Sequence, residues 1–229
     1  MNREELMMDI LEAIGGRRSI RAFKPDAVPR EVIERVLRAA AQCPSYMNTQ
    51  PWEVIVVAGE ELRELARKLY EKASSEAPRQ PDIPYHTTLP PASLRRQQEH
   101  GARRLESLGI ARDDEEARDK LMLENYRFFD APCAVIIVME RELPLWSVFD
   151  AGAFVQTFML AAFAEGLGTC AQATVPGYGD VIRESLGIPA TKQIVLTTPV
   201  GYPDEEALAN RYKSARADIA EFTTWRSVE

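Results

Sequence analysis

The segment Arg17-Arg18-Ser19-Ile20-Arg21 follows a Gly-Gly pair and places three guanidinium groups and a hydroxyl within five residues. A guanidinium presents a planar fork of donors that matches phosphate oxygens. In an extended segment alternate residues share a face, so Arg17, Ser19 and Arg21 would point together and Arg18 would point away. The segment therefore predicts an anion site, and the alternative is a solvated basic turn.

A second polar segment, Pro44-Ser45-Tyr46-Met47-Asn48-Thr49-Gln50-Pro51-Trp52, precedes an apolar run. Amide side chains both donate and accept hydrogen bonds, which suits a heteroaromatic ring with alternating donors and acceptors. Taken alone, this segment could equally be a turn-rich loop between a helix and a strand. Together, the two segments suggest a site for a phosphorylated, planar cofactor.

Composition limits the classes of protein that fit. The chain has 229 residues, of which 45% are hydrophobic and 28% charged, with a net charge of -7. An acidic chain argues against general binding to nucleic acid or to anionic membranes. We expect no signal peptide at the acidic N-terminus and no membrane span in the apolar run 151–164, which is short. Three scattered cysteines fit a reducing cytoplasm.

The chain contains only two histidines, His86 and His100. This count excludes a His-rich metal site, and we expect no metal. A catalytic triad or a Cys-His pair would have to use one of these two residues. The simplest source of reactive chemistry is therefore a bound cofactor, with no catalytic side chain.

Hydrophobic periodicity predicts alternating helices and strands, without a repeat or a second domain. We expect an α+β or α/β domain over 1–229, with a loop and charged-helix insert or lid at about 76–130 and a C-terminal extension at about 201–229. The helix at 147–165 is apolar nearly all round, which predicts burial in the core or at a subunit interface. The other expected helices are 3–14, 29–42, 60–75, 93–108, 114–128 and 178–186, and the expected strands are 54–58, 134–139, 169–174 and 194–200.

The order RRSxR and then PSxxNxQPW resembles the nitroreductase family of FMN-dependent flavoenzymes, and the resemblance extends over nearly the whole chain. The insert, with Leu108-Gly109-Ile110-Ala111-Arg112 and the segment 125–132, is most similar to the branch that reduces nitrobenzoates. The resemblance implies an α+β fold with a mixed, mainly antiparallel sheet flanked by helices. It also implies an intertwined homodimer with FMN sites at the subunit interface.

The same resemblance implies roles for individual residues. Arg17, Arg18 and Ser19 would contact the FMN phosphate and ribityl chain. Arg21 would lie at the pyrimidine edge of the flavin, where a cation stabilises the negative charge that develops on reduction. The partner subunit would supply a loop to the ring and ribityl chain, with contacts from Pro44, Ser45, Tyr46, Asn48 and Gln50. Tyr46 and Met47 depart from the small residues often found in this loop.

Two further segments complete the implied cofactor site. Val175 and Pro176 would flank the ring, and the Gly177 amide would reach flavin N5, although the same residues also suit a simple turn. Ser214 and Arg216 would lie near the phosphate, although the tail could equally be solvated. Gly166, in a Gly-x-Gly that follows a helix, reads as a C-cap rather than part of a dinucleotide fingerprint.

The resemblance implies an NAD(P)H-dependent oxidoreductase that reduces nitroaromatic compounds by ping-pong hydride transfer through flavin N5. The small aromatic acceptor would take the place that the nicotinamide leaves. Three alternatives stay open at this stage. The same flavin scaffold could act on a quinone, an enone or a halogenated aromatic, or the chain could bind flavin without being an enzyme. It could also be a homodimeric interaction domain without a cofactor.

Overall fold

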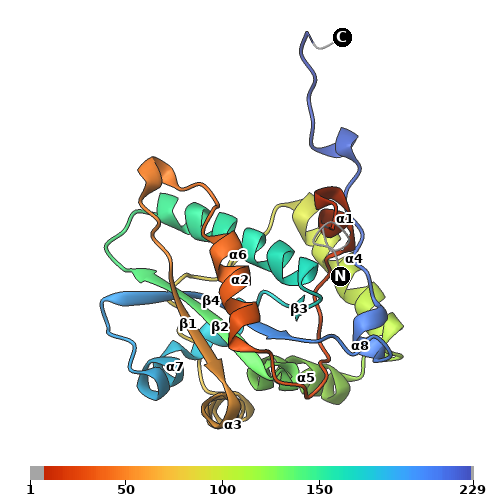
Figure 1. Cartoon of the computed structure of the whole chain (residues 1–229). Coiled ribbons are helices and arrows are strands. Elements are labelled where there is room, and N and C mark those ends of the chain that lie inside the picture. Colours follow the sequence, from red (N-terminus) through yellow and green to blue (C-terminus); the bar gives the residue numbers. More distant parts are fainter. Residues whose placement is uncertain (1–7, 228–229) are drawn as a thin grey trace, which may run out of the picture.

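A computed structural model describes residues 8–227 of the chain. Its centre is a sheet with the strand order β1-β2-β4-β3, in which all three strand pairs are antiparallel (Figure 1). An isolated parallel bridge joins Ser19 to Thr169 at the β3 edge, so the sheet is mixed but mainly antiparallel. The α+β class that the sequence implies is confirmed. The strands are β1 (Glu53–Ala58), β2 (Cys133–Glu140), β3 (Gly168–Thr169) and β4 (Lys192–Gly201).

Strand β2 is the buried strand of the sheet, and only its last residue, Glu140, is exposed. Alternate side chains of a strand point to opposite faces. Val135 and Ile137 accordingly join one hydrophobic cluster, whereas Ala134 and Ile136 join the other. The expected strand at 134–139 is therefore correct, and its continuous apolar sequence follows from helices that cover both faces.

Helices lie on both faces of the sheet and form three layers (Figure 1). One face carries α2 (Arg30–Ala40) and α6 (Trp146–Ala164), and the other carries α3 (Gly59–Ser74) and α7 (Gly179–Leu186). The chain crosses from layer to layer through short helical turns. These turns are η2 (Tyr46–Asn48), η3 (Glu124–Asp130) and η4 (Val175–Tyr178).

Two strand predictions need correction. The sequence predicts a buried strand at 54–58, but β1 is an edge strand in which Val57 alone is buried and Val56 is exposed. Its apolar residues are only partly covered, because β1 pairs with β2 and with no other strand among residues 8–227. The predicted strand 169–174 is also too long, because β3 ends at Thr169 and the chain then bends.

Helix α6 is buried on one face only. Phe154 and Phe158 lie in the core, whereas Trp146 and Phe149 stack on each other with ring centroids 5.5 Å apart and are exposed. This helix has 19 residues and a mean hydropathy of 1.4, so by length and composition it could cross a membrane. The same is true of many core helices of soluble proteins, and 44% of the apolar stretch is buried within this chain.

The N-terminal helix, the insert and the tail are less buried. Helix α1 (Ile10–Gly16) begins at the capping residue Asp9, and residues 3–7 of the predicted helix lie outside the described range. The insert contains α4 (Pro91–Ser107) and α5 (Glu115–Leu123), and neither has a buried residue. After α8 (Leu208–Arg211), the tail with η5 (Ile219–Glu221) projects from the body (Figure 1).

Because Phe158 is only 1% exposed and packs between α2 and the sheet, replacing it removes a large part of one core layer. We expect Phe158→Ala to lower the free energy of unfolding by about 3–5 kcal/mol, from lost burial and the cavity left behind. Chemical denaturation at a fixed protein concentration measures this change. The control Phe222→Ala, in the exposed tail, should leave the unfolding midpoint nearly unchanged; equal losses would contradict the assigned core.

Candidate functional site

The arginine segment is held in an extended form between β3 and the C-terminal region. The Ile20 amide donates to the Thr169 carbonyl at 2.9 Å, and the Lys24 amide donates to the Tyr202 carbonyl at 2.8 Å. Gly168 allows this close approach, because a Cβ atom there would lie 2.7 Å from Ile20. The extended backbone that the sequence predicts for this segment is therefore present.

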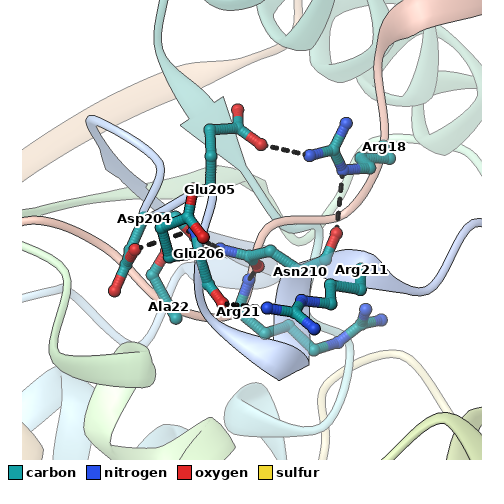
Figure 2. A network of polar contacts seen from close by, with 8 residues as sticks. All are labelled: Arg18, Arg21, Ala22, Asp204, Glu205, Glu206, Asn210 and Arg211. Carbon is teal, nitrogen blue, oxygen red and sulfur yellow. Dashed lines mark hydrogen bonds and ion pairs between the residues drawn. The ribbon is translucent and has the colours of Figure 1, made fainter.

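The buried residue Asn210, in α8, fixes the same segment from the other side (Figure 2). Its side-chain oxygen accepts from the Arg21 amide at 2.7 Å, and its side-chain nitrogen donates to the Ala22 carbonyl at 2.7 Å. The Arg18 Nε donates to the Asn210 carbonyl at 3.1 Å. Asn210 thus holds the backbone at Arg21 and Ala22 and the side chain of Arg18, although the sequence alone offers no reason to single it out.

Arg18 is directed away from the other arginines of the segment. It forms an ion pair with Glu205 in addition to its bond with Asn210 (Figure 2). The sequence predicts that Arg18 points away from Arg17, and both residues line the same cavity of about 210 Å³. In this conformation Arg18 is engaged within the chain, so its predicted contact with the phosphate and ribityl chain would require a different rotamer.

Four other guanidinium groups lie near one another, apart from the ion pair of Arg18 with Glu205. None of the four forms an ion pair with a carboxylate among residues 8–227. They belong to Arg17, Arg21, Arg104 and Arg216. Burial, and then the neighbouring Arg216, lower the pKa of Arg17. Burial, and then Arg21, lower the pKa of Arg104 to about 10. We refer to these four residues as the arginine cluster; they stay charged at neutral pH and repel one another.

The C-terminal tail brings two predicted residues to this cluster. The Arg216 Nη1 donates to the Ser214 hydroxyl at 2.7 Å and to the Ser214 carbonyl at 3.1 Å. Arg216 is exposed, yet it is close enough to Arg17 to lower the pKa of that side chain. The structure therefore brings Arg17, Arg21 and Arg216 together from segments almost two hundred residues apart.

The sequence-based prediction of the site does not include Arg104 of the cluster, nor two residues beside the cluster, His100 and Tyr212. Arg104 and His100 lie one helical turn apart on α4, and Tyr212 comes from the tail. The His100 Nδ1 lies 3.1 Å from the Tyr212 hydroxyl. Burial, and then Arg21, Arg104 and Arg216, lower the pKa of His100, so its ring is neutral at pH 7. The i, i+4 spacing of His100 and Arg104 is a signal in the sequence that could have identified this face.

The amide-rich loop at 44–50 lies at the other end of α6. The Tyr46 amide donates to the buried carboxylate of Asp150, in the first turns of that helix, at 3.1 Å. The Gln50 amide donates to the Ser45 hydroxyl at 3.0 Å. Beyond the loop, Trp52 stacks on Phe154 with ring centroids 4.9 Å apart. The loop thus has a fixed anchor at each end, and Tyr46 and Met47 between them are exposed.

The backbone of this loop is strained. Met47, Asn48 and Gln50 have φ values of 47°, 58° and 46°, in the left-handed region that non-glycine residues seldom occupy. Asparagine tolerates this region, but methionine and glutamine have no such preference. Each such residue costs on the order of 1–3 kcal/mol, and strain of this kind clusters at binding sites. The strain fits a functional role for the loop, and Phe128, Phe129 and Asp130 of η3 share it with φ values of 52°, 55° and 56°.

The loop and the arginine cluster are far apart within one chain. The loop is anchored at Asp150, whereas Phe163, near the far end of α6, contacts Gly16 directly before Arg17. The rise along the helix from residue 150 to residue 163 is about 20 Å. One chain therefore does not bring the amides of the loop next to the arginines.

The turn η4 contains the predicted residues Val175, Pro176 and Gly177, and all three are buried. The Gly177 amide donates to the Thr174 carbonyl at 3.1 Å. The sequence led us to expect this amide to face a ligand, but in this conformation the turn itself uses it. The insert covers the turn: the Gln80 amide donates to the Gly177 carbonyl at 2.7 Å, and a Cβ atom at Gly177 would lie 2.7 Å from the Tyr85 hydroxyl.

Gly166 ends α6 as the sequence predicts. Its φ of 75° is left-handed, and the Leu167 amide donates to the Ala162 carbonyl at 2.8 Å, which closes the helix end. Cys43, next to the loop, is buried, and burial followed by the Asp150 carboxylate raises the pKa of its thiol. That environment disfavours the nucleophilic thiolate, so Cys43 serves as a packing residue.

The cavities lie in different parts of the molecule, and the predicted site residues do not all line the same one. One cavity, of about 890 Å³, lies between α3 and the end of η3 and contains none of the predicted site residues. A smaller one of about 210 Å³ is lined by Arg17, Arg18 and Thr169. A third, of about 220 Å³, lies between the insert residue Tyr85 and Pro176. Within residues 8–227, no three His, Cys, Asp or Glu side chains are grouped to hold a metal.

Comparison with known proteins shows the relationship of the whole chain. Residues 14–202 match the profile of the Nitroreductase family. The chain is 36% identical to Nitroreductase NfnB of Mycolicibacterium smegmatis over 92% of its length and 89% of that protein. It is 31% identical to 4-nitrobenzoate reductase of Pseudomonas putida, over 95% of this chain and 96% of that protein.

A solved structure agrees with these sequence matches. The crystal structure of the FMN- and NADPH-dependent nitroreductase NfnB from Sphigopyxis sp. strain HMH superposes with a TM-score of 0.93 and 30% identity. The alignment covers 96% of this chain and all of that one. The extended arginine segment, the strained loop and the three layers thus belong to a known fold, and the chain is a member of the nitroreductase family.

Proposed function

We propose that this chain is an FMN-dependent NAD(P)H oxidoreductase that reduces nitroaromatic compounds. Relatives named as nitroreductases and nitrobenzoate reductases match it over most of their length. The observation that carries the proposal is the arginine cluster, which holds four positive charges with no carboxylate partner among the described residues. A cluster of that kind requires an anionic ligand, because unpaired, partly buried charges are costly.

The donors present fit FMN. Its phosphate carries a charge of about -1.5 to -2 at pH 7, which Arg17, Ser19 and Arg216 can bind from two sides of the cluster. Arg21 would lie at the pyrimidine edge of the ring, and Ser214 orients the Arg216 guanidinium through its hydroxyl. Arg104, from the insert, is a further cation beside Arg21.

Bound FMN would supply a ring that accepts two electrons from NAD(P)H and passes them to the nitro group. The residues of the chain bind and orient; none of them has to act as a nucleophile. The positive charges of Arg21 and of the partly buried Arg104 would stabilise negative charge on the bound ring. The turn η4 is buried beneath the insert, which would act as a lid over a flat ring packed against the turn.

We further propose that the functional unit is a homodimer located in the cytoplasm. The ribityl chain of FMN adjoins its phosphate, so a loop that contacts it must approach the arginines closely. Within one chain the loop anchor is about 20 Å from the arginine end of α6. If two copies of the chain pack through α6 about a two-fold axis, the loop 44–50 of one copy reaches the arginine end of α6 in the other. The exposed aromatic residues Trp146 and Phe149 on α6 suit such an interface.

Domain organisation follows from the same proposal. We treat 1–229 as one domain, in which the insert at about 76–130 acts as a lid and the extension at about 201–229 carries Ser214 and Arg216. Tyr85 of the insert reaches the carbonyl of Ala173 at 3.1 Å and covers the turn η4. Tyr46 and Met47 of the exposed loop are positioned to shape the place of the acceptor.

The proposal predicts the spectrum of the purified protein. We expect an oxidised-flavin spectrum that bleaches when NADPH is added anaerobically and returns when 4-nitrobenzoate follows. Absorbance between 350 and 550 nm is a standard range for flavins, and stopped-flow recording separates the two half-reactions. A flavin that bleaches but is not reoxidised would keep the cofactor and exclude this acceptor. A protein without flavin, even after FMN is added, would refute the proposal.

Removal of one phosphate contact should weaken cofactor binding. We expect Arg216→Ala to raise the FMN dissociation constant about tenfold or more, because a hydrogen bond to a charged group contributes about 1.5–3 kcal/mol. Quenching of FMN fluorescence during titration of the apoprotein measures the constant. The exposed Arg38 on α2 provides a control of equal charge, since Arg38→Ala should leave the constant unchanged. If Arg216→Ala bound FMN with the affinity of the unmodified protein, the tail would not be part of the phosphate site.

Mixed dimers test whether the loop acts across the interface. We expect Arg17→Ala chains and Asn48→Ala chains to bind FMN poorly when each is prepared alone. If the two are unfolded and refolded together, random pairing gives about one quarter of the sites intact, because each mixed dimer has one unmodified site. FMN bound per chain at a low FMN concentration measures the recovery. No recovery would mean that the loop and the arginines serve the same site within one chain.

A further inference from the structure

A second basic site lies beside the arginine cluster, between α4 and the C-terminal tail. It is a groove of about 220 Å³, and its polar lining is mostly basic. A groove of this size has room for a phosphate group. Its basic and hydroxyl-bearing residues are Arg95, Arg96, His100, Arg103, Tyr212 and Arg216, and two glutamates, Glu99 and Glu221, also line it.

The basic residues of α4 reach the groove by helical spacing. Arg96, His100 and Arg103 are separated by four and three residues, so they share one face of the helix. The tail faces them with Tyr212, whose hydroxyl lies 3.1 Å from His100 Nδ1. Two elements that are distant in sequence thus present donors to the same space.

The groove retains positive charge after its internal ion pairs are counted. Arg96 pairs with Glu221 at 3.0 Å, and Arg95 approaches Glu99 at 3.9 Å. Arg103 and Arg216 pair with no carboxylate among the described residues. The ring of His100 is neutral at pH 7, because burial and the surrounding arginines lower its pKa. The groove therefore offers about two positive charges, a neutral imidazole and a hydroxyl, which match a phosphate monoester dianion.

The position of the groove identifies the kind of phosphate. Arg216 belongs both to the groove and to the arginine cluster, so the groove borders the place proposed for the phosphate of FMN. A donor that stacks on the flavin must extend its other end over the surrounding surface. Of the two pyridine dinucleotides, only NADPH carries a monoester phosphate there, on the 2′-oxygen of its adenosine.

We propose that the groove between α4 and the tail binds the 2′-phosphate of NADPH, so that the enzyme selects NADPH over NADH. The inference rests on the proposed function. Arg103 is the residue that it singles out, because Arg103 lies in the groove but outside the arginine cluster. The insert then has a second role, because the basic face of α4 distinguishes NADPH from NADH.

The experiment uses the FMN-loaded protein and three variants. Calorimetric titration with adenosine 2′,5′-bisphosphate and with 5′-AMP measures the contribution of the 2′-phosphate directly. We expect the bisphosphate to bind at least tenfold more tightly, and Arg103→Ala to lose most of that difference. Arg103→Lys should keep part of it, since the charge remains without the planar fork. Arg38→Ala, on the exposed face of α2, should behave as the unmodified protein.

Steady-state kinetics with both donors provide the second readout. We expect kcat/KM for NADPH to fall about tenfold in Arg103→Ala, while the value for NADH stays within twofold. Equal losses with both donors, or equal binding of the two adenosine probes by the unmodified protein, would overturn the inference. A loss of FMN affinity in Arg103→Ala would instead assign the groove to the cofactor phosphate. A protein that takes up no FMN would refute the proposed function itself, whereas a flavoprotein reduced equally by both donors would refute only this inference.

Discussion

The attachment of the segment 17–24 to the rest of the molecule is the constraint on which the site depends. This segment has no helix of its own and is not a full strand. It is held by the Thr169 carbonyl on one side and by the side chain of Asn210 on the other. A buried amide that bonds both a backbone N–H and a backbone carbonyl leaves little freedom to the residues between them. The direction of Arg17 and Arg21 follows from that backbone, and so does the separate role of Arg18 with Glu205.

Mutual repulsion in the arginine cluster gives the site its chemical character. Four like charges converge from the N-terminal segment, the insert and the tail, and each element alone would present an ordinary solvated arginine. Since these elements meet only in the folded chain, the electrostatic cost is a property of the tertiary structure. The ligand-free protein bears this cost as reduced stability, and an anion relieves it on binding. Stability and affinity are thus linked through the same side chains.

The sequence predicts much of the fold because local patterns determine it. The apolar run of β2, the capping of α6 by Gly166 and the helical spacing of α2 and α3 are all visible in the printed residues. The prediction that strand 54–58 is buried is wrong, because the burial of an edge strand such as β1 depends on neighbours that a local pattern does not reveal. Arg17, Arg21 and Arg216 could be selected through family resemblance. Asn210, Asp150 and Arg104 act through distant segments, so only the three-dimensional arrangement identifies them.

The loop 44–50 has one more consequence, which concerns how this protein can change over evolutionary time. Its tip residues, Tyr46 and Met47, are 59% and 80% exposed, and the loop is anchored by Asp150 and Trp52 rather than by these side chains. Substitutions at the two tip positions therefore remove almost no packing within the chain, although the left-handed φ of Met47 still favours residues that tolerate that region. Substitutions at these two positions can change which electron acceptor fits the site. The anchors of the loop and the arginine segment meanwhile keep cofactor binding unchanged.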